Sequence, residues 1–323
     1  MIAVTGGAGF IGSAIIWRLN SLGDDNIVIV DELGQGDKWK NLVGLRFVDF
    51  INKNDFINNL EKDLKYNFNA IIHMGANSST TEKDADYLIR NNYEYTKKLA
   101  QFSIANKVRF IYASSGATYG DGSKGFDDDE NSVAILNPLN MYGYSKQLFD
   151  LWAIKQNMLN CIVGLKYFNV YGPNEYHKGD MRSVVHKAFE QIRDEGYVRL
   201  FKSKNPAYKD GEQMRDFIYV KDAVDMTLWF LKNKDKNGLY NVGSGKARTW
   251  NDLVIAIFNA LDKPVNINYI EMPKHLEHKY QYYTEAKVDK IRKAGYTKSP
   301  QSLEEGVTDY VKNFLLREKY FGV

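Results

Sequence analysis

Two features of the sequence combine residue types at spacings that could do chemistry. Tyr142 and Lys146 are four residues apart, so a helix would place a phenol and an ammonium on one face. Residues 5–12, with the sequence TGGAGFIG, follow an apolar run at the N-terminus. A phenol beside a positive charge can accept a proton from an alcohol, and a glycine-rich turn that opens a helix can hold a dinucleotide pyrophosphate. Together they predict redox chemistry on an alcohol or a sugar with a nicotinamide cofactor.

The glycine-rich stretch has the spacing of a dinucleotide-binding fingerprint. Gly7, Gly9 and Gly12 follow the pattern G-x-G-x-x-G, and Gly6 precedes them. Such glycines permit a tight turn, a close approach of the backbone to the pyrophosphate, and close packing of the helix on the strand. The free N–H groups at the helix start would face the phosphates. A purely structural glycine turn is the alternative.

An acidic pair follows this fingerprint at the distance that a dinucleotide site requires. Asp31 and Glu32 stand at the end of the next expected strand, about 20 residues on, where a carboxylate binds the ribose hydroxyls. The charge of Asp31 would oppose a 2′-phosphate and so favours NAD. Lys38 and Lys53 would offset that repulsion if they reach the same site. These residues leave NAD and NADP both open.

Tyr142 needs a neighbouring charge to act as a base at neutral pH. An unperturbed tyrosine has a pKa of about 10, and we expect the Lys146 ammonium to lower the Tyr142 pKa by favouring the phenolate. Lys146 could also contact the nicotinamide ribose. Ser115 ends an expected strand, at the edge where such sheets bind ligands, and could hydrogen-bond the substrate oxygen. The alternatives are an accidental pair on an exposed helix and a local strand-end hydrogen bond of Ser115.

The apolar pattern places these residues in a chain of alternating strands and helices. Apolar runs predict strands at residues 2–4, 27–30, 45–48, 70–73, 108–113 and 161–167, and amphipathic segments predict helices at 10–22, 83–106 and 145–157. Apolar strands separated by helices indicate an α/β fold with a doubly wound parallel sheet. A helix at 220–232 and a strand at 239–242 would return to this sheet.

The pattern becomes less regular after about residue 171, which predicts a smaller C-terminal lobe. We expect a Rossmann domain for NAD(P) binding, formed by residues 1–168 and about 217–247. The substrate-binding lobe would comprise residues of about 169–216 and 248–323.

The composition argues against several classes of protein. Of the 323 residues, 44% are hydrophobic and 26% charged, and the formal net charge of +3 is too small to indicate nucleic-acid binding by itself. No apolar stretch approaches the ~20 residues of a membrane span, and no leader is expected before the first strand. The single cysteine, Cys161, lies in a run expected to be buried and cannot form an intrachain disulfide. A cytoplasmic location is therefore expected.

Other polar patterns are given no functional role. Residues 127–130, three aspartates and a glutamate, are expected to form a solvated loop. His275 and His278 have a spacing that a metal could use, but no cysteine or carboxylate set completes a site, so no metal is expected. His73, at the end of an expected strand, is expected to be packed.

Several short motifs give the chain a family resemblance. They are SSTT at 78–81, NNY at 91–93, YFNVYGP at 167–173, HKG at 177–179 and RDF at 215–217. With the features above, they resemble the extended short-chain dehydrogenases/reductases, an NAD(P)-dependent epimerase/dehydratase family that acts largely on nucleotide sugars. Over nearly the whole chain the sequence is similar to the ADP-glycero-manno-heptose 6-epimerases of that family, and HKG is the most discriminating motif.

This resemblance implies a reaction at carbon 6 of the heptose in ADP-D-glycero-β-D-manno-heptose, which is converted to the L-glycero form for the lipopolysaccharide inner core. Bound NADP, with NAD as the alternative, would oxidise that carbon to a transient ketone and reduce it on the other face. The resemblance assigns the two proton transfers to Tyr142 and Lys178. It also implies a nucleotide sugar as ligand, a homo-oligomer (a pentamer in that family), and neither nucleic acid nor membrane as a partner.

The resemblance also assigns contact residues. Those that match cofactor contacts are Gly6, Gly9, Phe10, Ile11, Gly12, Asp31, Glu32, Lys38, Lys53, Met74, Gly75, Ala76, Asn77, Ser78, Asn91 and Lys146. Those that match substrate contacts are Asn169, Val170, Asp180, Lys187, Phe201, Lys202, Ser203, Lys204, Arg215 and Tyr280. Asp180, Lys187 and Lys204 depart from the family pattern, which has Ser, His and Ser there. The guanidinium of Arg215 suits a diphosphate.

Two other functions stay open. A 4-epimerase or 4,6-dehydratase acting on a UDP- or dTDP-sugar would use the same fold. Such dehydratases carry an Asp-Glu pair beside the catalytic hydroxyl, whereas Ser115 is followed by Gly116, Ala117 and Thr118, and a 4-epimerase would not need Lys178. A non-catalytic cofactor-sensing protein is the second alternative, although such proteins commonly lack the tyrosine or the lysine.

Overall fold

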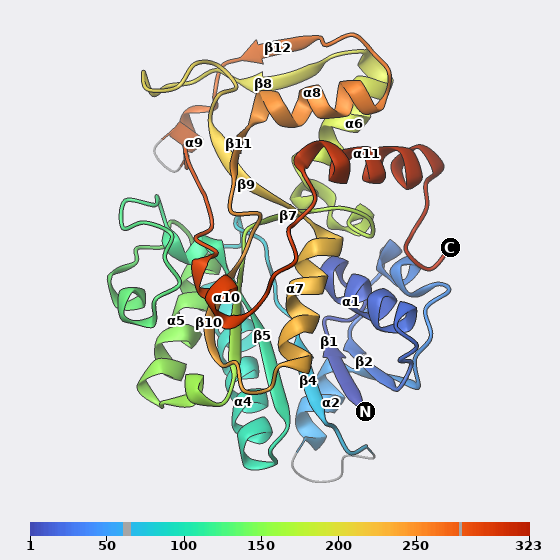
Figure 1. The fold of residues 1–323 in the computed structure, drawn as a ribbon, viewed down its shortest axis with the longest axis vertical. Coiled ribbons are helices and arrows are strands. Elements are labelled where there is room, and N and C mark those ends of the chain that lie inside the picture. The colour runs from blue at the N-terminus through green and yellow to red at the C-terminus, as the bar shows by residue number, and fades with distance from the viewer. Residues whose placement is uncertain (61–65, 278–279) are drawn as a thin grey trace.

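A parallel β-sheet organises the first half of the chain (Figure 1). The computed structural model describes residues 1–60, 66–277 and 280–323. In these residues seven parallel strands lie in the order β10-β6-β5-β4-β1-β2-β3. They are β1 (Ile2–Thr5), β2 (Ile27–Asp31), β3 (Asp49–Asn52), β4 (Ala70–His73), β5 (Arg109–Ser115), β6 (Val163–Tyr167) and β10 (Gly238–Val242).

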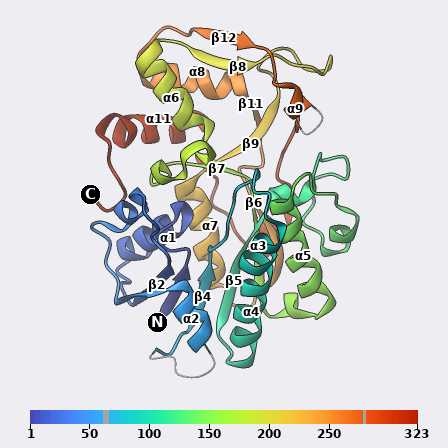
Figure 2. The same cartoon turned by 180° about the vertical axis from the view of Figure 1, so that it is seen from behind.

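Helices cover both faces of this sheet, because successive side chains of a strand point to opposite faces. Ile2 and Val4 of β1 share a hydrophobic cluster with residues of α1 and α7, whereas Ala3 belongs to a second cluster with residues of α2, α4 and α5. The two groups of helices lie on opposite sides of the sheet in Figures 1 and 2. Their bounds are α1 (Phe10–Ser21), α2 (Lys53–Asn59), α4 (Tyr95–Ala105), α5 (Met141–Lys155) and α7 (Val220–Lys232). The predicted doubly wound α/β class is confirmed.

A smaller group of elements lies beyond the carboxyl ends of the sheet strands (Figure 1). A three-stranded sheet in the order β11-β9-β7 and a β12-β8 pair lie there with α6, α8 and α11. The strands are β7 (Asn169–Tyr171), β8 (Val198–Phe201), β9 (Met214–Tyr219), β11 (Ala247–Thr249) and β12 (Ile267–Ile270). The helices are α6 (Val184–Glu195), α8 (Trp250–Ala260) and α11 (Leu303–Asn313), and shorter ones elsewhere are α3 (Ala85–Leu88), α9 (Lys274–Glu277) and α10 (Asp289–Ala294). The division into two domains at the expected boundaries stays a prediction.

Two expected elements differ from the structure. The strand expected at 45–48 is wrong: β3 begins at Asp49, while Leu45 and Phe47 pack against the core from the preceding loop and Val48 is 52% exposed. The apolar residues of that loop resemble a strand in sequence, whereas the true edge strand has only two apolar residues, both partly buried. The helix expected at 83–106 is present as an unbroken helical run from Ala85 to Ala105, but its middle, Ile89–Glu94, is a π-helix between α3 and α4.

Two expectations about burial are also wrong. Cys161 is exposed, since it lies in a turn before β6, which begins only at Val163. The acidic run at 127–130 is not a purely solvated loop. Asp128 is buried and accepts the N–H of Asn241 at 2.8 Å, and Glu130 accepts the N–H of Leu239 at 2.9 Å. The run therefore binds free N–H groups of β10, the edge strand of the large sheet.

Three other expectations concern packing, metals and membranes. His73 is packed as expected, with 1% of its surface exposed. Among the described residues no group of three or more His, Cys, Asp or Glu side chains could hold a metal, and His278 lies outside those residues. The described helices include none with the length and apolar character needed to cross a membrane.

Candidate active site

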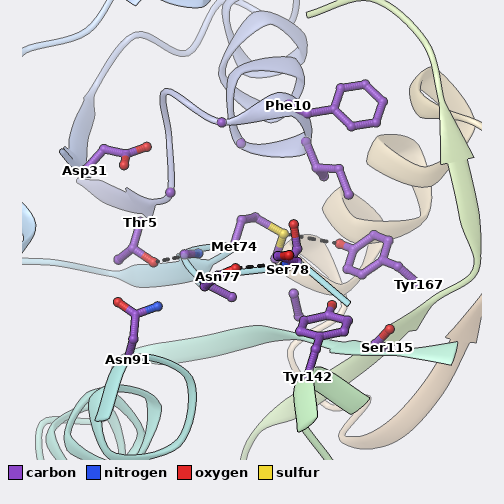
Figure 3. Close-up of a pocket in the computed structure, with 18 of the residues that line it drawn as sticks. Thr5, Phe10, Asp31, Met74, Asn77, Ser78, Asn91, Ser115, Tyr142 and Tyr167 are labelled. Carbon is purple, nitrogen blue, oxygen red and sulfur yellow. Dashed lines mark hydrogen bonds between the residues drawn. The ribbon is translucent and has the colours of Figure 1, made fainter. Parts of the chain in front are cut away.

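A cavity of about 520 Å³ lies at the carboxyl ends of β1 and β4 (Figure 3). These two strands are neighbours at the point where the strand order reverses, which is where doubly wound sheets bind ligands. The loops that follow them, residues 6–12 and 74–78, line the cavity. Every residue that the sequence assigned to the cofactor lies on its wall, from Gly6 to Lys146.

Gly6 and Gly12 explain why the first loop needs glycines. Gly6 has a φ of +66°, and a Cβ at this position would lie 2.6 Å from the backbone nitrogen of Gly75 in the second loop. A Cβ on Gly12 would lie 2.1 Å from the carbonyl oxygen of Gly6. The turn, its helix and the second loop can therefore meet only without side chains. Because α1 follows Gly9, which has no side chain to cap it, its first N–H groups are left for a ligand.

Two acid–lysine pairs lie at one end of the cavity. Asp31 is buried, and its carboxylate accepts the N–H of Ala8 at 2.8 Å and the ammonium of Lys38 at 2.6 Å. The ammonium of Lys53 lies 2.6 Å from the carboxylate of Glu32. Both lysines therefore reach the acidic pair, which is the condition under which they could offset its charge.

Asn91 joins this end of the cavity through an unusual helical turn. It lies in the π-helix at Ile89–Glu94, and its side-chain oxygen accepts a hydrogen bond from Lys53 at 3.2 Å. The next residue, Asn92, accepts the N–H of Asn77 at 2.9 Å and so fixes the loop after β4. Single π turns are frequent at functional sites, and this one directs Asn91 at Lys53 and Asn92 at the loop after β4.

Ser115 and Tyr142 lie together at the other end of the cavity (Figure 3). Asn140 caps α5 by accepting the N–H of Gly143 at 2.9 Å, so the first turn of that helix carries Tyr142. Ser115 is the last residue of β5. Burial raises the pKa of Tyr142, and a hydrogen bond with Ser115 acts in the opposite direction without reversing the shift. Tyr142 therefore holds its proton at neutral pH.

The expected effect of Lys146 on Tyr142 is wrong for this structure, because the Tyr142 pKa is raised rather than lowered. Lys146 lies on the cavity wall, but its ammonium donates to the carbonyl oxygen of Ala113 in β5 at 2.7 Å. Burial lowers the pKa of Lys146 to about 8, and the nearby Asp150 carboxylate acts against that shift. Lys146 is thus a buried cation anchored to β5, and it does not set the titration of the phenol.

Lys178 reaches the same cavity from a different part of the chain. It lies in the 3₁₀ turn at Tyr176–Met181, between β7 and α6, and its ammonium is 5.4 Å from the centre of the Phe10 ring. Burial lowers the pKa of Lys178, the Glu175 carboxylate raises it, and Lys187 lowers it, with a net decrease. An ammonium with a lowered pKa releases its proton more readily. The cavity therefore holds two groups that can transfer protons, one on α5 and one on this turn.

The residues matched to substrate contacts are more dispersed. Val170 lines the cavity, whereas the others lie outside its wall. Asn169 is exposed next to Val170 in β7, and Asp180 is exposed in the turn of Lys178. Lys187 on α6 is close enough to Lys178 to lower the pKa of Lys178. This group therefore lies around the Lys178 side of the cavity.

Another group of these residues lies in the smaller lobe. The Arg215 guanidinium is buried 5.6 Å from the centre of the Trp250 ring and 5.3 Å from that of Tyr280. The Tyr280 hydroxyl accepts the indole N–H of Trp250 at 2.9 Å. The structure thus brings Arg215 and Tyr280 together, and their contact with substrate stays a prediction.

The stretch from Phe201 to Lys204 begins at the last residue of β8. The ammonium groups of Lys202 and Lys204 lie 3.0 Å and 2.5 Å from the carboxylate of Glu271. The N–H of Ser203 donates to Asp210 at 2.8 Å. Both lysines therefore form ion pairs with Glu271. An anionic ligand that binds them would have to replace the Glu271 carboxylate.

The chain matches a known family over most of its length. Residues 2–243 match the NAD dependent epimerase/dehydratase family. The chain belongs to this family. It is 56% identical over 316 residues to the ADP-L-glycero-D-manno-heptose-6-epimerase of Nitratidesulfovibrio vulgaris (strain DP4), a match that covers 98% of both chains.

Solved structures agree with the family assignment. The Helicobacter pylori ADP-L-glycero-D-manno-heptose-6-epimerase superposes with a TM-score of 0.80 at 29% identity, and the match covers 97% of this chain and 95% of that one. A UDP-N-acetylglucosamine 4-epimerase from Methanobrevibacter ruminantium M1 gives a TM-score of 0.82 at 27% identity over 98% of both chains. The fold is thus shared across epimerases of different sugars, while the curated sequence match is to a heptose enzyme.

The cavity of this epimerase/dehydratase family member also contains residues that the sequence did not assign. They are Thr5, Val30, Ser79, Tyr87, Tyr95, Ala113, Ser114, Tyr167, Phe168, His177 and Met181. Most of them are direct neighbours in sequence of an assigned residue, so their positions within the motifs could have indicated that they line the cavity. Tyr87 and Tyr95 had no such signal, because they flank the π-helix. Burial and nearby lysines lower the pKa of His177 to about 4, so it faces the cavity uncharged at neutral pH.

Proposed function

We propose that the chain inverts carbon 6 of the heptose in ADP-D-glycero-β-D-manno-heptose to give ADP-L-glycero-β-D-manno-heptose. The similarity to heptose 6-epimerases extends over 98% of the chain. The observation that carries the mechanism is the presence of Tyr142 and Lys178 in the cavity formed by the dinucleotide-binding loops. A reaction that removes hydride from one face of a carbon and returns it to the other needs a proton-transfer group for each orientation of the substrate.

The residues of this chain divide the work of such a reaction. One of Tyr142 and Lys178 accepts the proton of the C6 hydroxyl, and the other returns a proton to the oxygen after the ketone has turned. Ser115 hydrogen-bonds the reacting oxygen, and Lys146 contacts the cofactor ribose. When bound, the nicotinamide supplies the hydride acceptor and donor. The residues assigned to the cofactor, from Gly6 to Asn91, hold the dinucleotide along the loops after β1 and β4.

NADP is the cofactor that the acid–lysine pairs support. Asp31 alone would repel a 2′-phosphate, but Lys38 neutralises its carboxylate at 2.6 Å. Lys53 lies at the same end and pairs with the more exposed Glu32. Two ammonium groups at the adenosine ribose give a 2′-phosphate charge-assisted partners. NAD would use the Asp31 carboxylate without needing either lysine.

The ADP-heptose is bound on the side of the cavity that faces the smaller lobe. Arg215 and Tyr280 bind its nucleotide and diphosphate with the stretch from Phe201 to Lys204. Asn169, Val170, Asp180 and Lys187 contact the sugar part. The buried guanidinium of Arg215, held between two rings, supports the diphosphate assignment because it is a rigid cation of the right shape. The protein would act in lipopolysaccharide synthesis in the cytoplasm, as a homo-oligomer and, by family resemblance, a pentamer.

Substrate choice tests this proposal. Purified protein is incubated separately with ADP-D-glycero-β-D-manno-heptose and with UDP-galactose, and the products are separated by chromatography. Epimerisation of the heptose nucleotide, without conversion of UDP-galactose, is the expected result. Turnover of only the UDP-sugar would replace the proposal with a UDP-sugar 4-epimerase, the class of enzyme to which the Methanobrevibacter ruminantium M1 protein belongs.

A further inference from the structure

One buried carboxylate ties together both ends of the turn that carries Lys178. Glu175 has 0% of its surface exposed. One of its oxygens accepts the Ser183 hydroxyl at 2.6 Å and the Gly172 N–H at 3.4 Å, and the other accepts the Ser183 N–H at 2.5 Å. Gly172 lies before the turn and Ser183 after it. These bonds therefore close residues 172–183 into a loop around Lys178.

The hydrogen-bond donors around Glu175 act in favour of its ionised form. Each of these partners donates a hydrogen to the carboxylate, and such donors stabilise the anion. Ser183 also caps α6, where the first N–H groups of the helix favour a negative charge. The phenols of Tyr176 and of Tyr310 on α11 lie close to it, and the Tyr310 hydroxyl hydrogen-bonds the carboxylate. Burial raises the pKa of Glu175 above its ordinary value, and the hydrogen bonds from Ser183 and the charge of Lys178 offset only part of that rise.

Lys178 is the cation whose charged form the Glu175 carboxylate stabilises. Its other charged or titratable neighbours are Lys187 on α6, which repels it, and His177, which is neutral at neutral pH. The Phe10 ring of α1 offers its face to the ammonium at 5.4 Å. Glu175 opposes both the burial of Lys178 and its repulsion by Lys187. The carboxylate is therefore coupled to Lys178 by charge as well as by the backbone of the loop.

We propose that Glu175 is a positioning residue for proton transfer by Lys178: its buried carboxylate holds the turn in place and supplies the negative charge that stabilises the protonated form of Lys178. This inference rests on the proposed function, because it concerns the role given to Lys178. A role in capping α6 alone is the competing explanation. That role would need the hydrogen bonds of Glu175 but not its charge, and the two explanations separate on this point.

Glu175→Gln tests the charge, because glutamine keeps the size and one acceptor oxygen. Ser183→Ala is the matched control, which removes a donor and the helix cap but keeps the carboxylate. In Glu175→Gln the limb of the pH–rate profile that belongs to Lys178 should move to lower pH by about one unit. The shift should have the same sign in both reaction directions, since loss of the anion makes the ammonium easier to deprotonate. Ser183→Ala should lower the melting temperature and leave that limb in place.

A limb that stays in place in Glu175→Gln, or that moves equally in Ser183→Ala, would overturn the inference in favour of capping alone. A second measurement does not depend on turnover: Lys178 is labelled with an amine-reactive reagent at a series of pH values, and its peptide is quantified by mass spectrometry. Half-labelling should occur at lower pH in Glu175→Gln and at the wild-type pH in Glu175→Asp. If Glu175→Gln does not fold, a shifted labelling pH in Glu175→Asp, which keeps the charge, would still contradict the inference.

The labelling result also separates this inference from the proposed function. If Lys178→Met keeps near-normal turnover, the two-sided mechanism fails. Labelling would still show whether Glu175 and Lys178 are coupled.

Discussion

Burial shifts the pKa of each residue proposed to transfer protons in the direction that favours its uncharged form. Burial raises the pKa of Tyr142 and lowers that of Lys178. The first is a phenol that holds its proton, and the second is an ammonium that gives one up more readily than usual. Two groups of such different character in one cavity suit a reaction in which one accepts a proton and the other returns it.

Tyr142→Phe should keep the bound cofactor and lower kcat by about 10²–10⁴-fold, because the ring still fills its place while the hydroxyl that transfers the proton is lost. Tyr144→Phe is the matched control, since Tyr144 lies on the same helix with 44% of its surface exposed. Turnover of the heptose nucleotide and dinucleotide extracted per chain are the measurements. A Tyr142→Phe variant within fivefold of the wild type would contradict the role of the phenol.

Lys38→Ala should weaken NADP binding by about 1.5–3 kcal/mol, the worth of a hydrogen bond to a charged group. Binding of NAD should change less, because NAD has no phosphate at that position. Lys40→Ala is the control, since Lys40 pairs with Asp37 at 3.1 Å in the same stretch and does not line the cavity. Fluorescence titration of nucleotide-stripped protein with each dinucleotide gives the Kd values. Equal losses for NAD and NADP would count against a 2′-phosphate site.

Lys166 and Asp150 join the elements that carry the active site. Asp150 on α5 accepts the ammonium of Lys166 on β6 at 2.8 Å, and both side chains have 0% exposure. Asp150 also accepts the hydroxyls of Tyr112 and Ser114 on β5 at 2.9 Å and 2.7 Å. Lys166 donates in turn to Thr118, just after Ser115, at 2.8 Å. One buried network thus fixes the helix of Tyr142 against the strand end of Ser115.

Lys166→Met should lower the free energy of unfolding by about 3–5 kcal/mol, because it leaves the Asp150 carboxylate buried without its cation. Lys312→Met is the control: the Lys312–Asp262 pair is exposed and 3.5 Å long, so its loss should cost at most about 1 kcal/mol. Urea unfolding followed by fluorescence measures both. Similar losses in the two variants would show that the buried pair does not anchor α5.

A strand could be predicted from the sequence where its side chains are buried, because burial requires a run of apolar residues. Strands β1, β2 and β4 are buried on both faces, so their apolar runs identified them. The edge strand β3 has only two apolar residues and none that is fully buried, so the longer apolar run before it was assigned instead. In the site, residues inside contiguous motifs could be assigned. Glu175 could not be assigned a role, because its partners Gly172 and Ser183 become visible only when the turn closes in three dimensions.

Two buried histidines, His73 and His186, and the partly buried His177 make the stability of the whole molecule depend on pH. Burial lowers the pKa of His73 to about 3, and those of His177 and His186 to about 4. In the unfolded chain each has a pKa of about 6.5. Below about pH 6.5 these histidines bind protons in the unfolded state, whereas in the folded state they stay unprotonated until the pH is much lower. Their contribution to the free energy of unfolding is therefore fully present above about pH 6.5 and is lost as the pH falls toward about 4. The loss is about 1.4 kcal/mol per pH unit for each histidine that is protonated only in the unfolded state.

The unfolding free energy is measured with urea at pH 7.5, 6 and 5. It should fall with pH less steeply in His73→Gln than in the wild type, and the difference in slope should correspond to about one proton taken up on unfolding. The comparison with this variant isolates His73, since other groups titrate in the same range. Asp128 is one of them, because burial raises its pKa to about 6. Equal slopes in the two proteins would mean that His73 is not the source of acid sensitivity.

Transfer of the hydrogen at carbon 6 tests the redox account most directly. ADP-D-glycero-β-D-manno-heptose that carries deuterium at that carbon is converted in ordinary water, and the product is analysed by mass spectrometry and NMR. Full retention of the deuterium at carbon 6 of the L-glycero product is predicted, because the hydride leaves and returns within one cavity. Replacement of the deuterium by solvent hydrogen would contradict hydride transfer and the roles given to the residues around the dinucleotide.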